Sequence, residues 1–182
     1  MKANSACPYL DVPPRRGSWS GEYFRKMAPG RDTVSAERVI RAPAAVIFDV
    51  IADPSRHVDF DGSGSVRRAS QEAPARLFQG AVFVMEMKRS LPYGMANTVV
   101  EFEENRAIAW APRFANGRAR KFFGRVWRYE LEPAEDGTLV RETWDVSHDR
   151  LRIFLRRLFS APFRRDMEES LRLLDGLVTT AI

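Results

Sequence analysis

The sequence predicts an α+β fold in which an antiparallel sheet of about six to seven strands curves around one long C-terminal helix. Apolar and polar residues alternate through the middle of the chain, as they do in half-buried strands. Only short turn signals separate these segments, which favours hairpins. Beyond residue 163, apolar residues recur at helical spacing. The chain has 182 residues, which is enough for one domain with a full hydrophobic core.

Residues 1–32 are expected to form an extended or disordered tail, because prolines and glycines interrupt every periodic pattern there. Met27 is an alternative start of the protein. The folded domain is expected to span residues 33–182 and to open with a strand, since TVSAERVIR is β-branched and alternating. Pro43 is expected at the first position of a short helix that stops at Asp53-Pro54. The polar stretch SRHVDFDGSGS then predicts a short helix or a loop.

The middle of the chain predicts consecutive strands in the segments GAVFVMEMK, MANTVVEFEE, AIAWAP, KFFGRVWRYELEP and TLVRETWDVS. Turns are expected at residues 104–105 and 135–137. In the last strand, Val140, Trp144 and Val146 oppose Arg141 and Asp145, so one face of the sheet is strongly apolar. The C-terminal helix carries a matching apolar stripe, and we expect it to cover this face.

Three segments of the chain also resemble the SRPBCC superfamily, the START-like group that includes polyketide cyclases and lipid-transfer proteins. The matching segments are VIRAPAAVIFDVIADPSRH, VVEFEENRAIAW and WRYELEPAEDGTLVRETWDVS, and the resemblance extends over about residues 33–180. It implies a helix-grip fold, in which a curved sheet wraps the last helix and leaves a deep cavity. Members of this group include carriers of lipids, hormones and isoprenoids, aromatase/cyclases, and catalytic domains of ring-hydroxylating oxygenases, so the fold alone does not determine the function.

The inward-facing side chains are the candidate ligand-binding residues. Methionine adapts to irregular shapes, and tryptophan and tyrosine offer a flat apolar surface with one polar tip. The alternative is that these side chains simply pack as a core. The set comprises Phe83, Met85, Met87, Met95, Trp110, Trp127, Tyr129, Trp144, Met167, Leu171 and Leu174.

Three polar residues are candidates for orienting a ligand or for assisting enolisation. Asn97 shares its strand face with Met95, and Tyr93 lies at the preceding turn. Arg38 shares a face with apolar neighbours and would attract a carboxylate or an enolate. Alternatively, Arg38 reaches solvent at the edge of the strand, as long cationic side chains do.

The cluster His57-Val58-Asp59-Phe60-Asp61 combines an imidazole with two carboxylates, which suits metal binding or acid–base chemistry. The only other histidine is His148, and the Cys and His ligands of a Rieske centre are missing from the chain. We therefore interpret the cluster as a surface loop with a capping aspartate, and we expect no metal and no cofactor. The sequence contains no GxSxG motif of a serine nucleophile, and its sole cysteine, Cys7, lies in the tail with no histidine near it in the sequence. We therefore expect no nucleophilic catalysis.

The segment 150–165 combines an apolar stripe with a basic face. This segment could form a lid over the cavity, or it could make transient contact with an anionic membrane, and both interpretations stay open. The net charge is +5, but the arginines follow no nucleic-acid-binding motif, so nucleic acid is not an expected partner. No apolar run has the length of a membrane span, and no secretory signal is evident, so we expect a cytoplasmic protein. The oligomeric state stays open.

These observations predict a protein that binds or transfers an apolar small molecule, such as a lipid, an isoprenoid or a polyketide-like compound, in an internal cavity. One alternative is an aromatase/cyclase-like enzyme, which would act as a cyclase or dehydrase without a metal. Another is an interaction module with a vestigial cavity, whose basic lid contacts a protein or a membrane.

Overall fold

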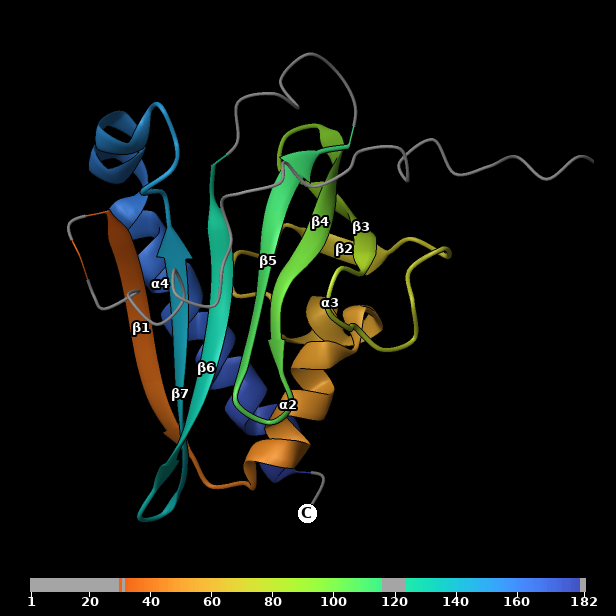
Figure 1. The fold of residues 1–182 in the computed structure, drawn as a ribbon, viewed down its shortest axis with the longest axis vertical. Helices are drawn as coiled ribbons and strands as arrows, with labels where there is room; N and C mark the ends of the chain where they lie inside the picture. Colours follow the sequence, from red (N-terminus) through yellow and green to blue (C-terminus); the bar gives the residue numbers. More distant parts are fainter. Residues whose placement is uncertain (1–29, 31, 116–123, 181–182) are drawn as a thin grey trace, which may run out of the picture.

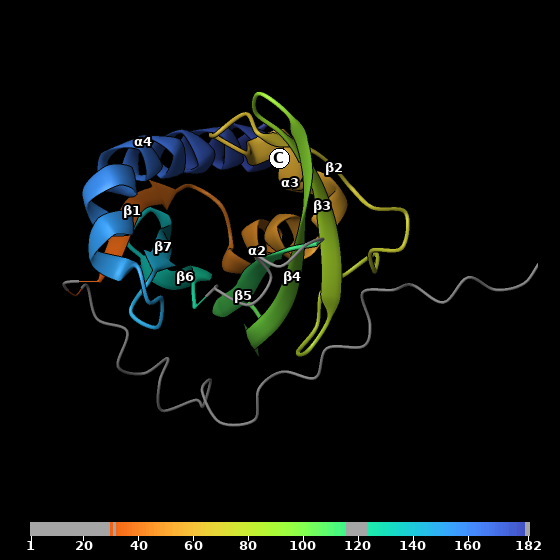
Figure 2. The same cartoon turned by 90° about the horizontal axis from the view of Figure 1, so that it is seen from above.

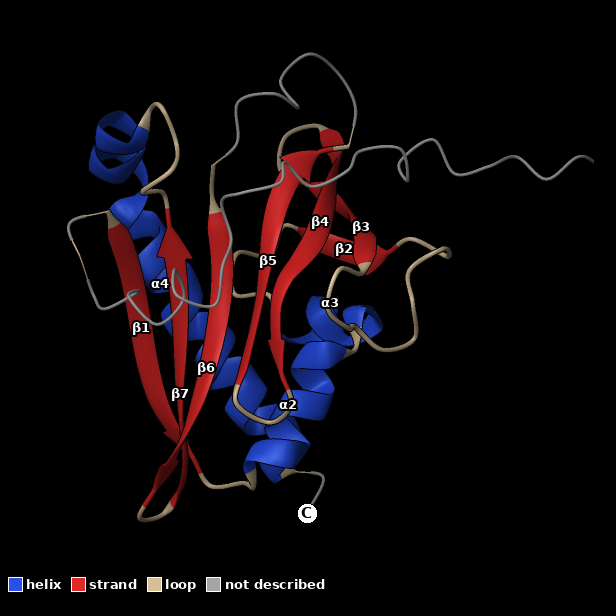
Figure 3. Cartoon of the chain, viewed as in Figure 1, coloured by secondary structure: helices blue, strands red, loops and turns tan. Residues whose placement is uncertain are grey.

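The computed structural model describes residues 30, 32–115 and 124–180 (Figure 1). The expectations for residues 1–29, including the start at Met27, lie outside this part of the chain. Figure 3 shows the distribution of helices and strands. Strands β2 to β7 follow one another along the chain, and most of the helical residues lie in the C-terminal helix. The elements are β1 (Thr33–Ile40), α2 (Ala44–Ala52), the 3₁₀ turn η1 (Pro54–Arg56), α3 (His57–Phe60), β2 (Val66–Ala69), β3 (Val82–Lys88), β4 (Pro92–Glu103), β5 (Ala107–Phe114), β6 (Val126–Ala134), β7 (Gly137–Asp145) and α4 (Arg152–Thr179).

The strands form one antiparallel sheet of seven strands in the order β1-β7-β6-β5-β4-β3-β2. All neighbours except β1 and β7 are consecutive in the chain, as the short turns predicted. Viewed from above, the sheet curls around α2, α4 runs along the open side of the curl, and α3 lies next to α4 and β2 (Figure 2). The predicted α+β, helix-grip architecture is therefore confirmed.

The hairpin between β6 and β7 turns at Glu135 and Asp136 and ends at Gly137, where the sequence predicted a turn. Gly137 has a φ of 141°, and a Cβ atom there would lie 2.3 Å from the carbonyl oxygen of Ile40. Glycine is therefore required at this position both by the backbone conformation and by the close approach of the β1 end.

Helix α2 buries Ile47, Phe48 and Ile51 and ends at Asp53, before Pro54. Pro43 lies at the N-cap of this helix, one position earlier than expected. Its φ of −61° suits either position, and the ψ of 143° gives it the extended conformation of a cap. The boundary differs by one residue because sequence pattern alone places helix ends poorly.

Helix α4 is a single element with Pro162 inside it. Its first turns run in a different direction from the remainder (Figure 2), and an internal proline is the usual cause of such a bend. The segment 150–165 is thus continuous with the helix that crosses the sheet. No helix in the described ranges is long and apolar enough to cross a membrane.

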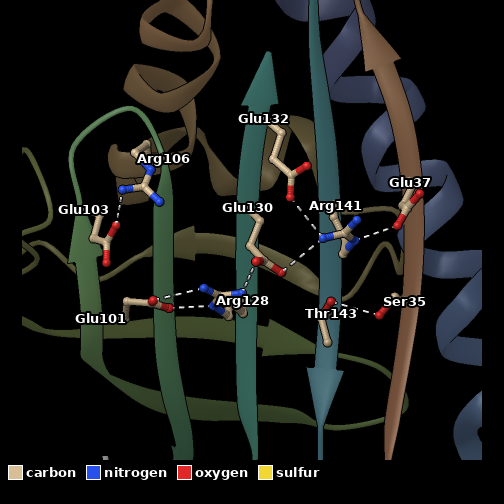
Figure 4. Close-up of polar contacts among 10 residues, drawn as sticks. All are labelled: Ser35, Glu37, Glu101, Glu103, Arg106, Arg128, Glu130, Glu132, Arg141 and Thr143. Carbon is tan, nitrogen blue, oxygen red and sulfur yellow. Dashed lines mark hydrogen bonds and ion pairs between the residues drawn. The ribbon is translucent and has the colours of Figure 1, made fainter. Parts of the chain in front are cut away.

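The outer face of the sheet carries a network of charged side chains (Figure 4). Arg128 on β6 reaches over β5 to Glu101 on β4, with Nε–Oε2 and Nη2–Oε1 distances of 2.6 and 3.0 Å, and both side chains are buried. Two local features permit this contact. The residue between them on β5 is Ala109, which is too small to block the path. A β-bulge between Val99 and Glu101 turns Glu101 outward although Val99 points inward.

Candidate ligand cavity

The concave face of the sheet, the α3 region and the middle of α4 line a partly open cavity of about 740 Å³. This volume falls within the range of sites that hold drug-sized ligands, about 300–1,000 Å³. Most of the residues that line it are apolar, and many are aromatic or methionine.

The structure places eight of the candidate ligand-binding residues in the lining and three elsewhere. The lining contains Phe83, Met85, Met87, Met95, Trp110, Trp127, Tyr129 and Trp144. Met167, Leu171 and Leu174 are fully buried in the hydrophobic core and do not line the cavity. A neighbouring stripe of α4 reaches the cavity in their place, and it consists of Phe159, Phe163, Asp166 and Ser170.

Aromatic rings pack against one another around the cavity and fix its shape. The His57 ring stacks on Trp110 at a centroid distance of 5.3 Å, and Trp110 packs on Tyr129 at 5.6 Å. On the α4 side, Phe163 contacts Trp144 edge-on at 4.6 Å and Trp127 at 5.7 Å. Such ring pairs hold side chains in defined orientations beyond what area burial alone provides. The wall thus presents flat apolar surfaces.

A carboxyl group interrupts this apolar wall. Glu142 on β7 is 1% exposed and lines the cavity. Its strand neighbours are Ala36 on β1 and Tyr129 on β6, and the small Ala36 side chain leaves room beside it. The indole Nε1–H of Trp127 donates to Glu142 Oε1 at 2.6 Å. Within the described part of the chain, Oε2 accepts no hydrogen bond of ordinary geometry.

Burial raises the pKa of Glu142 from 4.5 to about 8, because the apolar surroundings disfavour the charged form. The nearby carboxylates of Asp61 and Asp166 raise the pKa further, whereas Tyr129 and Trp127 lower it. The same burial, together with Glu142, raises the pKa of Tyr129 well above its usual value. Both shifts favour the protonated, uncharged form of these groups at neutral pH.

His57 is buried and lines the cavity, so the interpretation of its segment as a surface loop is wrong for this residue. Its Nε2 lies 2.8 Å from the carbonyl oxygen of Ile51, and since a carbonyl only accepts, Nε2 carries the proton. The lone pair is then on Nδ1. Burial lowers the pKa of His57, which keeps the ring neutral.

Asp61 stabilises the loop after α3 internally, and Gly62 holds this loop against α4. Asp61 accepts hydrogen bonds from the backbone N–H groups of Ser63 and Val66, at 3.1 and 2.7 Å, which is the capping role expected for an aspartate here. Gly62 N–H donates to Ser170 Oγ at 2.9 Å, and a Cβ atom on Gly62 would lie 2.0 Å from the backbone oxygen of Asp166. The loop therefore closes one side of the cavity by direct backbone contact with the helix.

The three polar candidates are placed differently. Asn97 and Tyr93 line the cavity. The Asn97 amide donates to the carbonyl oxygen of Met95 at 3.1 Å, which orients it within the wall. Arg38 is partly exposed outside the lining and forms an ion pair with Asp175 on α4 at 2.8 Å.

Charged groups in the lining other than Glu142 are engaged with one another or with structural partners. Arg125 forms an ion pair with Asp149 at 2.9 Å, and Arg89 lies 3.7 Å from Asp166. Among the residues that the structure describes, no group of three or more His, Cys, Asp or Glu side chains is close enough to hold a metal ion.

Glu142 and His57 are the titratable groups of greatest chemical interest among the lining residues that were missing from the ligand-binding set predicted from sequence. The alternation of β7 held a signal for Glu142, since it has the same parity as Val140 and Trp144, and a carboxylate between two inward residues is unusual. His57 had no such signal, because its burial depends on how α3 packs against β3 and β5.

Comparison with known proteins gives the following relatives. The chain is 37% identical over 119 residues to uncharacterized protein Rv0088 of Mycobacterium tuberculosis, and the match covers 64% of this chain and 48% of that protein. The chain thus spans about half the length of the curated relatives it matches.

Solved structures share the fold at low sequence identity. Ms6760 from Mycobacterium smegmatis is similar with a TM-score of 0.62 and 14% identity, over 82% of this chain and 92% of that one. CV1439 from Chromobacterium violaceum has a TM-score of 0.59 and 16% identity, over 82% and 98%. DynU16, a protein of the dynemicin biosynthetic locus, has a TM-score of 0.60 and 14% identity, over 84% and 49%.

The family profile described as polyketide cyclase / dehydrase and lipid transport matches residues 31–179, which is nearly the whole folded domain. The sequence resemblance, the seven-stranded sheet around α4 and this match agree. The chain belongs to the polyketide cyclase / dehydrase and lipid transport family.

Proposed function

We propose that this protein binds an apolar small molecule in the cavity between its sheet and α4. The observation that carries the proposal is a pocket of about 740 Å³ with an aromatic and methionine wall. The pocket is partly open, so water contacts its apolar wall. An apolar ligand in the pocket would remove this wall from water, which is favourable. The family description, which includes lipid transport, supports the same class of ligand.

Native mass spectrometry of the protein as purified, followed by displacement of an apolar fluorescent dye with fatty acids, tests this proposal. We expect a co-purified mass or displacement at micromolar concentrations. Met95→Trp, which fills part of the cavity, should weaken dye binding at least fivefold. Phe78→Trp is the matched control, because Phe78 is exposed and does not line the cavity. No bound mass and no dye binding by the wild-type protein would refute the proposal.

A second candidate function is cyclase-like proton transfer. The observation that favours it is that the cavity holds both a neutral imidazole, His57, and a protonated carboxyl, Glu142. One can accept a proton from carbon while the other donates to a carbonyl oxygen. Product profiles of a reactive poly-β-keto thioester, with wild type and His57→Phe, test this candidate. Identical profiles with and without the protein would exclude it.

We also propose that the start of α4 contacts an anionic membrane surface. Four apolar side chains there are solvent-exposed, and exposed arginines flank them. The apolar residues are Leu151 at 59%, Ile153 at 67%, Phe154 at 61% and Leu158 at 54% exposure. The arginines are Arg150, Arg152, Arg156 and Arg157. Exposed apolar groups beside a basic face are typical of interfacial helices, whereas a lid would bury its apolar face.

Sedimentation with vesicles of phosphatidylcholine alone or mixed with phosphatidylglycerol tests the membrane contact. Binding should require phosphatidylglycerol, fall with added salt, and decrease at least fivefold in Phe154→Asp. Val39→Asp is the matched control, since Val39 is 48% exposed on β1. Equal loss of binding in both variants, or no binding by wild type, would contradict the proposal.

A further inference from the structure

Among the described residues, Glu142 is a buried polar group whose hydrogen bonds are incomplete. It is buried, it forms part of the cavity wall, and its Oε2 has no hydrogen-bond partner of ordinary geometry among the described residues. The outward carboxylates of the same sheet, such as Glu101, are paired with arginine. A buried polar group without a partner is unfavourable for folding unless a ligand completes its contacts.

Trp127 determines which oxygen of Glu142 is available. The indole N–H can only donate, and it donates to Oε1. The acidic proton of the neutral carboxyl is then on Oε2. The Tyr129 hydroxyl interacts with the same carboxyl group, from the strand position directly opposite. A protonated Oε2 is thus a hydrogen-bond donor among the aromatic side chains of the cavity wall.

The surroundings of Glu142 determine the charge of its partner. Asp61 and Asp166 act on Glu142 and would repel an anion. No arginine or lysine forms an ion pair with Glu142 in the described part of the chain. A cation would require the carboxyl to ionise in an apolar environment, which is costly even for a paired charge. An uncharged oxygen acceptor satisfies the donor without either cost.

We propose that Glu142 is the specificity-determining residue of the cavity and that it donates a hydrogen bond from Oε2 to a carbonyl oxygen of a flat, ring-containing apolar ligand. This inference rests on the proposed binding function. The flat shape follows from the rings that surround Glu142, namely Trp127 and Tyr129 on β6 and Trp144 on β7, with Phe163 of α4 edge-on to both tryptophans. Trp127 is a positioning residue, because it acts by orienting the carboxyl group.

Isothermal titration calorimetry at pH 6.5 with three probes of one shape tests this proposal. The probes are fluorene, 9-fluorenone and 9-aminofluorene, which differ only in carrying no polar group, a carbonyl or an ammonium. We expect the wild-type protein to bind 9-fluorenone about tenfold more tightly than fluorene, the gain of about one buried hydrogen bond. 9-Aminofluorene should bind more weakly than 9-fluorenone.

Variants at position 142 test whether the preference for the ketone comes from a hydrogen bond donated by this side chain or from the shape of the cavity. In Glu142→Leu the donor is absent, so the two affinities should become equal while fluorene still binds. Glu142→Gln should keep most of the preference, because its amide oxygen can accept from Trp127 and leave the amide N–H₂ as the donor. Glu142→Met is a second apolar variant should the leucine variant fail to fold. Fluorene affinity itself reports whether the cavity of each variant is intact.

Three results would overturn the assignment of Glu142 while leaving the binding function in place. These are equal binding of fluorene and 9-fluorenone to wild type, a ketone preference that survives Glu142→Leu, and tighter binding of 9-aminofluorene than of 9-fluorenone. A preference lost in Tyr129→Phe but kept in Glu142→Leu would assign the donor to Tyr129 and refute the proposal as well. Failure of the wild-type protein to bind any probe would refute the binding function together with this inference.

Discussion

Replacing Glu142 with glutamine should make the protein more stable, and the gain should depend on pH. Glutamine has nearly the same shape and can accept the Trp127 hydrogen bond, but it cannot ionise. In the unfolded chain the carboxyl has a pKa near 4.5, and in the folded protein burial raises the pKa to about 8. The comparison of wild type with Glu142→Gln therefore isolates the free energy of unfolding that this one titration controls.

The sign of the effect follows from the two pKa values. Below pH 4.5 the carboxyl is protonated in both states, and its titration does not affect stability. Between pH 4.5 and 8 the unfolded chain ionises and the folded protein does not, so stability is progressively lost as pH rises. One pKa unit corresponds to about 1.4 kcal/mol, so the loss at pH 7 is about 3 kcal/mol. Above pH 8 both states are ionised and the loss stays constant.

Urea unfolding of wild type and Glu142→Gln at pH 5, 6, 7 and 8 measures this difference. The groups that face Glu142 are Tyr129 on β6, Asp61 after α3 and Asp166 on α4, and they are present in both proteins. Glu168→Gln is the matched control, because Glu168 is exposed on α4. The advantage of Glu142→Gln should grow by about 2.5 kcal/mol from pH 5 to pH 7. A constant advantage, or a less stable Glu142→Gln, would refute the reasoning.

Two further predictions concern the packing that shapes the cavity and the sheet. Glu101→Ala leaves the buried Arg128 without its main partner and should lower the free energy of unfolding by about 3 kcal/mol. Chemical denaturation measures this loss. A loss below about 1 kcal/mol would show that the ion pair contributes little to stability. Gly62→Ala should be destabilising because its Cβ would lie 2.0 Å from the Asp166 backbone oxygen, whereas Gly176→Ala, with nothing within 4 Å, should gain about 1 kcal/mol from helix propensity. Thermal melts of both glycine variants compare the effects, and equal shifts of Tm would contradict this account.

Local sequence pattern determined most of the fold. The alternation of β6 and β7, the turn at residues 135–137, and the helical spacing of Met167, Leu171 and Leu174 depend only on which side of its own element each residue lies. Each of these features is decided by contacts near in sequence, so the pattern predicts it. The family resemblance then supplied the closure of the sheet around α4.

Tertiary structure decided what the interior contains. The sequence pattern predicts which residues face the inside of the sheet. It does not predict which of these residues pack in the core and which line the cavity, because that depends on how α3 and α4 pack against the sheet. Tertiary packing buries His57 and brings Trp127 and Glu142 together from neighbouring strands, and a β-bulge turns Glu101 outward. These arrangements rest on contacts between residues distant in the chain. The apolar inner face and the inward position of Glu142 were therefore readable from the alternation of β7, whereas the burial of Glu142 beside Trp127 depended on the folded protein.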